Sequence, residues 1–333
     1  MSKKPLPHTE ISPTLASFPA LPEAEALRHY LQRSTSENTR KTYRSALRQF
    51  EKWGGRLPTD RDTLVRYLLN RAQTLNTRSL DLHLTAISQW HQHQGMHDPV
   101  QDPLIRKTME GIRRVHGQPK RKATALRLEH IVQLLDHLQK QPRSLATVRD
   151  QALILVGYFG AFRRSELVAL QVDDLVWEPE GLLVRLSRSK TDQLASGMTR
   201  ALPWGPDNLC PVKALRDWLK LANLSAGPVF RPINRWGQIR MTPLNPSAIN
   251  DVLKRLGNEV GFTFVPELSS HSLRRGLSTS AARAKVPFEL IKKQGGWKND
   301  ATVWGYIEEG QPFTDNAAKA LMETLTAVQK IKG

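Results

Sequence analysis

The segment 269–306 carries side chains whose types and spacing could act on a phosphate group. His271 and Arg274 are three residues apart, so a helix would place both on one face. Trp297 follows two glycines, and Tyr306 supplies a hydroxyl that could serve as a nucleophile. Taken singly, each of these is more often a solvated surface residue or a core aromatic. Only their combination predicts part of a reactive site.

A second set of polar residues lies earlier in the chain and could complete this site. Arg163 follows an apolar run, so we expect it to be partly buried and to need an anionic partner, which Glu166 on the same helix face can supply. Arg164 would project differently and is expected to be a plain surface cation. Lys190 lies in a turn between two predicted strands, and a flexible hairpin could carry its ammonium into a cleft. As a lone turn lysine it would be unremarkable.

Hydroxyl attack on a phosphodiester is a reaction that such a set could perform. Charge builds on the non-bridging oxygens and on the leaving oxygen, so the reaction needs positioned cations. Arg163 and Arg274 could each donate two hydrogen bonds to phosphoryl oxygens. His271 and the indole N–H of Trp297 add donors, and His271 could also help to take the proton of the nucleophile.

Motifs for metal-dependent or nucleotide-dependent chemistry are missing from the sequence. It contains no G-x-x-x-x-G-K-[ST] phosphate loop and no H-E-x-x-H metal motif. The neighbouring carboxylates Asp173 and Asp174 are better explained by solvation of a turn and a strand edge. We therefore expect neither a metal ion nor a cofactor.

The composition indicates a polyanionic partner. The 333 residues include 49 lysines and arginines against 31 acidic residues, which gives a formal net charge of +18 and a pI near 10.3. Lysines and arginines recur in most of the predicted helices, and we find neither a long apolar span nor a basic amphipathic helix, so nucleic acid is expected and a membrane is not. Cys210 is the only cysteine, and no apolar signal segment follows Lys3 and Lys4, which predicts a cytoplasmic, nucleoid-associated protein.

Hydrophobic periodicity divides the chain into two predicted domains joined by a basic linker. Residues 1–21 contain four prolines and little apolar periodicity, which predicts a mobile arm. Residues 22–116 predict a small helical bundle with basic outer faces. Residues 117–124 predict a linker with three consecutive cations that could lie along a duplex backbone. Residues 125–333 would form the second domain.

The expected architecture is mainly α, with a small antiparallel sheet in the second domain. Short apolar runs separated by turn residues predict strands over 172–177, 182–187 and 199–204. Helix starts in the bundle are predicted at Ser34 with Glu37 as a capping box, at Asp60 or Asp62, at Asn76 and after Pro103. Helices of the second domain are predicted over 128–138, 145–159, 211–221, 245–257, 271–284, 287–293, 300–307 and 314–330.

With these residues the sequence resembles the tyrosine recombinases of the phage integrase family, and within them the Cre-like members. The R-x-S-E segment that begins at Arg163, the turn lysine, the H-x-x-R segment, the GGW sequence and the final tyrosine follow in the family's order and spacing. The SENTRK segment at 36–41 adds to the likeness, and only the stretch 1–21 is unmatched. Many family members carry His at the position of Trp297, which narrows the resemblance to the Cre-like subset.

The resemblance implies a two-domain DNA clamp made of an N-terminal SAM-like core-binding bundle and a catalytic domain. It implies site-specific DNA recombination without metal or ATP, in which Tyr306 attacks a phosphodiester and forms a 3′-phosphotyrosyl intermediate. A 5′-hydroxyl can then reverse the step. Lys190 is implied to protonate the leaving 5′-oxygen, and Glu166 is expected to orient Arg163.

The resemblance also implies a double-stranded DNA site with inverted repeats, bound by a homotetramer whose subunits are monomers when free. The candidate DNA contacts are Thr39, Lys41, Arg44, Arg78, the linker residues Lys120, Arg121 and Lys122, and Ser247, Asn250 and Lys254. Phosphate contact is the simpler expectation for every lysine and arginine among them. The predicted tail helix 314–330 has an apolar stripe that could pack on its own domain or dock on a neighbouring protomer.

Two alternatives stay open from the sequence. A type IB topoisomerase or telomere resolvase would share the chemistry and differ in its products. A recombinase descendant that only occupies its DNA site would belong to another class, and its expected mark is the loss of a catalytic position. None of these positions is lost in this sequence.

Overall fold

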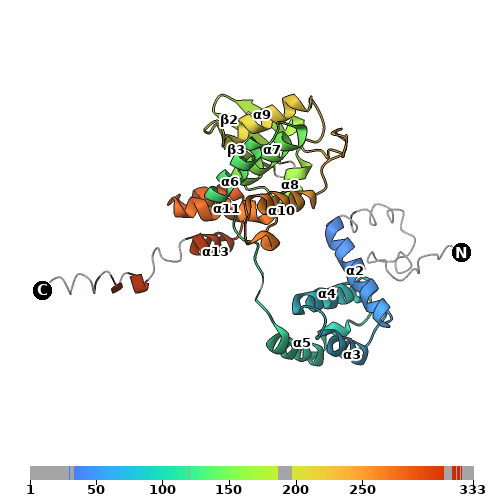
Figure 1. The fold of residues 1–333 in the computed structure, drawn as a ribbon. Coiled ribbons are helices and arrows are strands. Elements are labelled where there is room, and N and C mark those ends of the chain that lie inside the picture. The colour runs from blue at the N-terminus through green and yellow to red at the C-terminus, as the bar shows by residue number, and fades with distance from the viewer. Residues whose placement is uncertain are drawn as a thin grey trace. The chain divides into compact units, whose positions relative to one another are not determined.

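The computed structural model describes residues 34–119, 121–186 and 197–310, with positions 30, 317–319, 321, 322 and 324 in addition. The chain divides into two compact units, Met1–Lys120 and Arg121–Gly333, each with its own hydrophobic core. The described part is mainly helical with a small antiparallel sheet, which confirms the predicted fold class (Figure 1). The predicted arm 1–21 and most of the predicted helix 314–330 lie outside the described residues.

The described part of unit 1 is a bundle whose helices begin at side-chain caps. Its elements are α2 (Glu37–Trp53), α3 (Arg61–Arg71), α4 (Thr77–His93), the 3-10 helix η3 (Pro99–Gln101) and α5 (Pro103–His116). Asp60 and Asn76 cap α3 and α4 as predicted, each accepting a hydrogen bond from a backbone N–H of the first turn. The predicted capping box at Ser34 is wrong, because the hydroxyl of Ser36 accepts the hydrogen bond from the Thr39 N–H and so sets the start of α2.

The core of unit 1 is built from the apolar stripes of these helices. Leu47, Phe50, Leu68 and Ile87 are fully buried, and Ile105 of α5 is 1% exposed. Burial of an apolar side chain of this size stabilises a fold by about 1.5–3 kcal/mol. The apolar core therefore stabilises the bundle, and none of its described lysines and arginines is among the buried residues.

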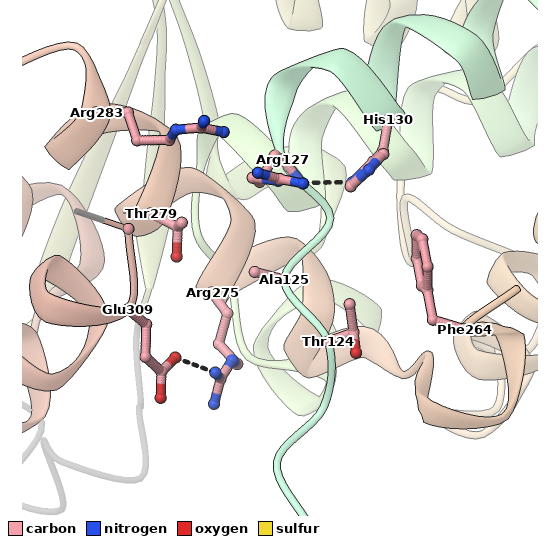
Figure 2. A pocket seen from close by; sticks show the side chains of 10 residues that line it. Thr124, Ala125, Arg127, His130, Phe264, Arg275, Thr279, Arg283 and Glu309 are labelled. Carbon is pink, nitrogen blue, oxygen red and sulfur yellow. Dashed lines mark hydrogen bonds and ion pairs between the residues drawn. The ribbon is translucent and has the colours of Figure 1, made fainter. Parts of the chain in front are cut away.

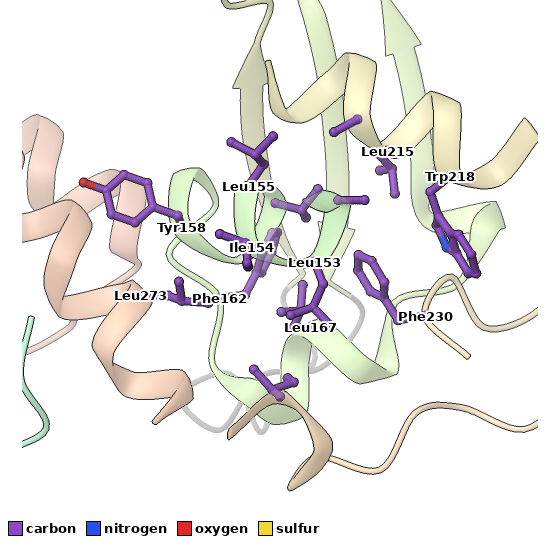
Figure 3. Close-up of a cluster of buried hydrophobic side chains, with 14 of the residues drawn as sticks. Leu153, Ile154, Leu155, Tyr158, Phe162, Leu167, Leu215, Trp218, Phe230 and Leu273 are labelled. Atoms are coloured by element: carbon purple, nitrogen blue, oxygen red, sulfur yellow. The ribbon is translucent and has the colours of Figure 1, made fainter. Parts of the chain in front are cut away.

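Helix α7 (Leu145–Phe159) is the central element of unit 2. Its residues 152–156 are fully buried, and it packs against α9 (Pro211–Leu221) and α11 (Ser270–Arg283). Figure 3 shows α7 side chains between Leu215 and Trp218 of α9 and Leu273 of α11. The other described helical elements of unit 2 are α6 (Leu128–Lys140), α8 (Arg164–Ala169), η4 (Val172–Asp174), α10 (Ala248–Val260), η5 (Val265–Glu267), α12 (Phe288–Gly295) and α13 (Asp300–Gly310).

The strands β1 (Leu175–Glu178), β2 (Gly181–Leu186) and β3 (Met198–Pro203) form an antiparallel sheet in the order β1-β2-β3. The first strand is shorter than predicted. Residues 172–174 form η4 instead, because Asp174 accepts a hydrogen bond from the Gln171 N–H at 2.9 Å and closes a turn there. In β3 the buried positions are Arg200 and Leu202, so an arginine faces the interior.

Helix α10 lies later in the chain than the predicted range 245–257. Asn245 accepts hydrogen bonds from both the N–H and the hydroxyl of Ser247 at 2.9 Å, which forms a turn and delays the start of the helix. The helix ends before Gly261, whose left-handed backbone has φ 86°. Among the described helices, none is both long and apolar enough to cross a membrane.

Candidate active site

The turn between α7 and α8 positions the first arginine of the site. Arg163 is the last residue before α8, not a residue on a helix face as predicted, and its backbone is extended. Glu166 accepts hydrogen bonds from the Arg163 N–H at 2.9 Å and from its Nη1 at 2.5 Å. With these two hydrogen bonds the carboxylate of Glu166 caps the start of α8 and holds the Arg163 guanidinium in one orientation. Glu166 is only 4% exposed, so little solvent competes with these contacts.

The same turn also holds a second arginine. Ala161 is fully buried and has φ 46°, in the left-handed region that residues with a Cβ rarely adopt. Its carbonyl accepts a hydrogen bond from Nη1 of Arg274. The hydrogen bond from Arg274 of α11 thus stabilises a strained, buried turn just before α8.

Arg274 of α11 is buried, with 2% of its surface exposed. Its guanidinium carbon lies 4.2 Å from the centre of the Trp297 ring, which is a cation–π contact. Burial and the positive charges of Arg163 and Arg200 lower the pKa of Arg274 to about 9. Its Nη2 has no hydrogen-bond partner among the described residues. A phosphate oxygen could accept from this donor and offset the repulsion between the cations.

Two glycines allow Trp297 to reach this position. A Cβ on Gly295 would lie 1.5 Å from the indole, so only a residue without a side chain fits there. Gly296 follows α12 with a left-handed φ of 59° and turns the chain. Trp297 is 8% exposed and belongs to a small apolar cluster with Val303 and Tyr306. The GGW sequence is therefore the turn that lays an indole over a buried arginine.

Tyr306 of α13 is 7% exposed, and its hydroxyl lies 3.2 Å from Nε2 of His271. The centres of the Tyr306 and Trp297 rings are 5.6 Å apart. Burial raises the pKa of Tyr306, although the charges of Arg274 and Arg275 oppose this effect. The phenol therefore stays protonated at neutral pH, and His271 is placed to accept its proton.

Arg275 and Glu309 form a second charged group beside Tyr306. The guanidinium carbon of Arg275 lies 5.5 Å from the centre of the Tyr306 ring, and Nη2 donates to Glu309. Glu309 also pairs with Lys122. Figure 2 shows Arg275 and Glu309 facing each other. Together with Arg127 they line a cavity of about 600 Å³. This group ties α13 to α11 and to the start of unit 2.

The described catalytic candidates lie around one site, linked by the contacts above. They are Arg163, Glu166, His271, Arg274, Trp297 and Tyr306. Lys190 lies outside the described residues. Within the ranges that the structure describes, no group of three or more His, Cys, Asp or Glu side chains could hold a metal ion.

Most of the predicted DNA contacts are at the surface. Exposed positions are Lys41, Arg44, Arg78, Arg121, Lys122, Ser247 and Lys254, and Lys120 lies outside the described residues. Several of these side chains already have partners within their own unit. Lys41 pairs with Glu37 at 2.7 Å, and Nη2 of Arg78 donates to the Gln118 carbonyl at 3.1 Å.

Two predicted DNA contacts serve the helix starts. The hydroxyls of Thr39 and Ser36 are 2.8 Å apart at the start of α2. Oδ1 of Asn250 accepts a hydrogen bond from the Ser270 N–H at 2.8 Å, at the first residue of α11. Asn250 therefore helps to position the helix that carries His271.

Two arginines near the site were not predicted from the sequence. Arg200 is 1% exposed and Arg275 is 8% exposed. The alternation of β3, which puts Arg200 on the same face as Leu202, is a signal that could have identified the first. Arg275 directly follows Arg274, and sequence spacing offers no comparable signal for it.

Comparisons with known proteins cover most of the chain. The model of the phage integrase family matches residues 124–325. The integrase/recombinase xerD homolog of Selenomonas ruminantium is 36% identical over 298 residues, which is 86% of this chain and 86% of the relative. Tyrosine recombinase XerA of Pyrococcus horikoshii is 25% identical over 300 residues, 89% of this chain and 88% of the relative. The XerH site-specific recombinase bound to a palindromic difH substrate, in a post-cleavage complex, has a TM-score of 0.63 and 17% identity over 88% of this chain and 82% of that chain.

These comparisons agree with the geometry of the site. The matched range 124–325 includes every described catalytic candidate. The likeness to the XerH structure concerns the fold, because the identity is low. The chain therefore belongs to the phage integrase family, and it is a tyrosine recombinase, a DNA-binding enzyme of site-specific recombination.

Proposed function

We propose that the protein cuts and rejoins DNA strands through a covalent 3′-phosphotyrosyl intermediate on Tyr306, without metal or ATP. The position of Tyr306 carries the proposal, because its hydroxyl lies 3.2 Å from Nε2 of His271. The same site holds the buried Arg274, whose Nη2 donates to no other described group. A hydroxyl, a proton acceptor and a phosphate-binding cation thus share one site, as transesterification of a phosphodiester requires.

In the proposed cleavage step, the Tyr306 oxygen attacks phosphorus and the P–O5′ bond breaks. His271 accepts the phenolic proton. The leaving 5′-oxygen takes a proton from Lys190, the role that the family resemblance implies for this lysine. Arg163 and Arg274 stabilise the charge that builds on the non-bridging oxygens. Rejoining reverses these bonds when a 5′-hydroxyl attacks the phosphotyrosine.

For the assembly, we infer a homotetramer on two double-stranded sites with inverted repeats, formed from free monomers. XerH, which resembles this chain in fold, binds a palindromic difH substrate. The proposed division into a core-binding domain over 22–116, a linker over 117–124 and a catalytic domain over 125–333 would let the protein clamp a duplex. The tail over 314–330 would contact a neighbouring protomer. The net charge of +18 supports the proposed binding to DNA. We infer that the protein acts in the cytoplasm, at the nucleoid.

A cognate DNA duplex with a nick beside the cleavage position tests this chemistry, because the short cleaved fragment diffuses away and cannot rejoin. The unmodified protein should accumulate a covalent protein–DNA adduct on denaturing gels. Tyr306→Phe should bind the same DNA and form no adduct. An adduct with Tyr306→Phe would show that another residue is the nucleophile. Products that join two separate sites would distinguish recombination from simple relaxation.

A further inference from the structure

Arg200 of β3 is one of the most deeply buried polar side chains of unit 2, with 1% of its surface exposed. The hydrogen bonds that it forms within the described residues go to the backbone carbonyls of Gln294 and Gly295, the latter at 2.9 Å. Its guanidinium carbon lies 5.8 Å from the centre of the Phe162 ring. Arg200 thus links the sheet to the end of α12.

These carbonyls end α12 directly before Trp297. The last carbonyls of a helix lack partners within the helix and carry partial negative charge, so a cation is favourable there. Gln294 ties the same turn to its surroundings, because Nε2 donates to the carbonyls of Phe159 at 2.7 Å and Ala201 at 3.2 Å. Two consecutive residues of β3 therefore hold the turn 294–296.

This turn decides where the indole of Trp297 lies. A Cβ on Gly296 would be 2.7 Å from Nη2 of Arg200, so the guanidinium packs directly against the bend. The chain then places Trp297 with its ring centre 4.2 Å from the guanidinium carbon of Arg274. A shift of the turn would move the indole away from an arginine that binds phosphate in the proposed function.

The favourable contact with these carbonyls is opposed by the cost of burying the charge of Arg200. Burial, together with the charge of Arg163, lowers the pKa of Arg200 to about 10, although Glu166 opposes the shift. Its Nε has no hydrogen-bond partner in the described part of the chain. A well-packed apolar side chain would avoid the desolvation of this charge. An apolar side chain could not, however, donate hydrogen bonds to the carbonyls of Gln294 and Gly295, as the guanidinium does.

We propose that Arg200 is a positioning residue of the active site, which holds the turn 294–296 so that Trp297 stays in contact with Arg274. In this role it sets the rate of strand cleavage without contacting the phosphate. The inference rests on the proposed function. A residue that served only the fold would affect stability and would not act through Trp297.

The protein without DNA allows a test that does not depend on activity. After labelling with 5-fluorotryptophan, the ¹⁹F resonance of Trp297 is the one that disappears in Trp297→Phe, and the other tryptophans report on the fold. Arg200→Met should shift the Trp297 resonance. Arg185→Met, at an exposed position of β2, is the matched control and should not. A folded Arg200→Met protein with an unshifted Trp297 resonance would overturn the proposal.

The rate of adduct formation on the nicked site at saturating DNA then tests whether Arg200 acts through Trp297. Arg200→Met should slow the reaction by up to about 100-fold with unchanged DNA affinity, because the site is misplaced and not emptied. Arg200→Lys should recover part of the rate, since an ammonium keeps the charge and loses the two-nitrogen geometry. In a Trp297→Phe background, Arg200→Met should cause little further loss, because both changes remove the same contact. Effects of the two changes that simply multiply would contradict the inference.

Two further outcomes are distinguishable. If the unmodified protein forms no adduct on its cognate site, the proposed function fails, and the ¹⁹F measurement still decides the position of Trp297. If Arg200→Met does not fold, Arg200→Gln replaces it in both measurements, since the Gln amide can still donate hydrogen bonds and carries no charge. A wild-type rate with Arg200→Gln, and an unshifted Trp297 resonance, would overturn the proposal.

Discussion

At the scale of single residues, opposing influences act on the hydroxyl of Tyr306. Burial raises its pKa, while the charges of Arg274 and Arg275 lower it, and the net direction is upward. The phenol is therefore protonated at neutral pH, and its deprotonation has to be part of any nucleophilic attack. This gives weight to His271, whose Nε2 lies 3.2 Å away although the residue as a whole is exposed.

Replacing His271 with Ala should slow adduct formation by about 100-fold or more, because the proposed proton acceptor is lost. Since the pKa of Tyr306 lies above its usual value, the phenolate fraction is small at neutral pH and rises with pH. The rate of His271→Ala should therefore climb between about pH 7 and about pH 9, more steeply than that of the unmodified protein. Single-turnover rates across this range check the expectation, with the exposed His97→Ala as control. Identical pH profiles would contradict it.

Two glycines near the site should respond in opposite ways to substitution. A Cβ on Gly295 would lie 1.5 Å from the Trp297 ring, whereas one on Gly305 of α13 would have nothing within 4 Å. Gly295→Ala should displace the indole, lower the melting temperature and slow adduct formation. Gly305→Ala should raise the free energy of unfolding by up to about 1 kcal/mol, because Ala favours the helix. Thermal unfolding and the adduct assay measure both. A wild-type rate in Gly295→Ala would contradict a role for the position of Trp297.

At the scale of elements, α13 is held near its C-terminal end by charge. Glu309 accepts a hydrogen bond from Arg275 of α11 and also pairs with Lys122. The Arg275 side chain is 9% exposed and the Lys122 side chain 57% exposed, so solvent screens the first pair far less than the second. The orientation of Tyr306 thus depends on a partly buried ion pair one turn further along its helix.

Glu309→Gln should loosen α13, because it leaves the buried Arg275 without its anionic partner. Amide hydrogen exchange in the peptide 300–310 should become about tenfold faster or more, which corresponds to about 1.4 kcal/mol. Lys122→Met removes the exposed half of the group and should change the exchange little. Mass spectrometry of exchange in the three proteins provides the measurement. Equal protection in all of them would mean that the ion pair does not hold the helix.

Local interactions explain which elements could be predicted from the sequence. Asp60 and Asn76 were identified as helix caps because a cap depends only on the next few residues. The position of Arg163 before α8 was missed, because it depends on how Glu166 binds its backbone and side chain together. Alternation in β3 can assign Arg200 to the inner face. Its partners at the end of α12 are set by tertiary packing, which no local pattern contains.

At the scale of the whole molecule, the net charge of +18 governs the encounter with DNA. Exposed cations occur on both units, for example Arg44 on α2 and Lys254 on α10. Contacts between such side chains and phosphates release counterions, so affinity falls steeply with salt and depends little on sequence. An experiment on salt dependence can therefore distinguish a direct contact with a DNA phosphate from an effect of the net charge alone.

Lys254→Gln should make the plot of log affinity against log salt concentration shallower by about 0.9, if Lys254 contacts one phosphate. The affinity loss should be similar on cognate and unrelated duplexes, because a phosphate contact carries no sequence information. Lys213→Gln is the matched control, since it removes the same charge from a lysine of α9 that pairs with Asp207 at 2.9 Å. Equal changes of slope in both variants would show that binding responds to net charge. A change confined to Lys254→Gln would place α10 on the DNA backbone.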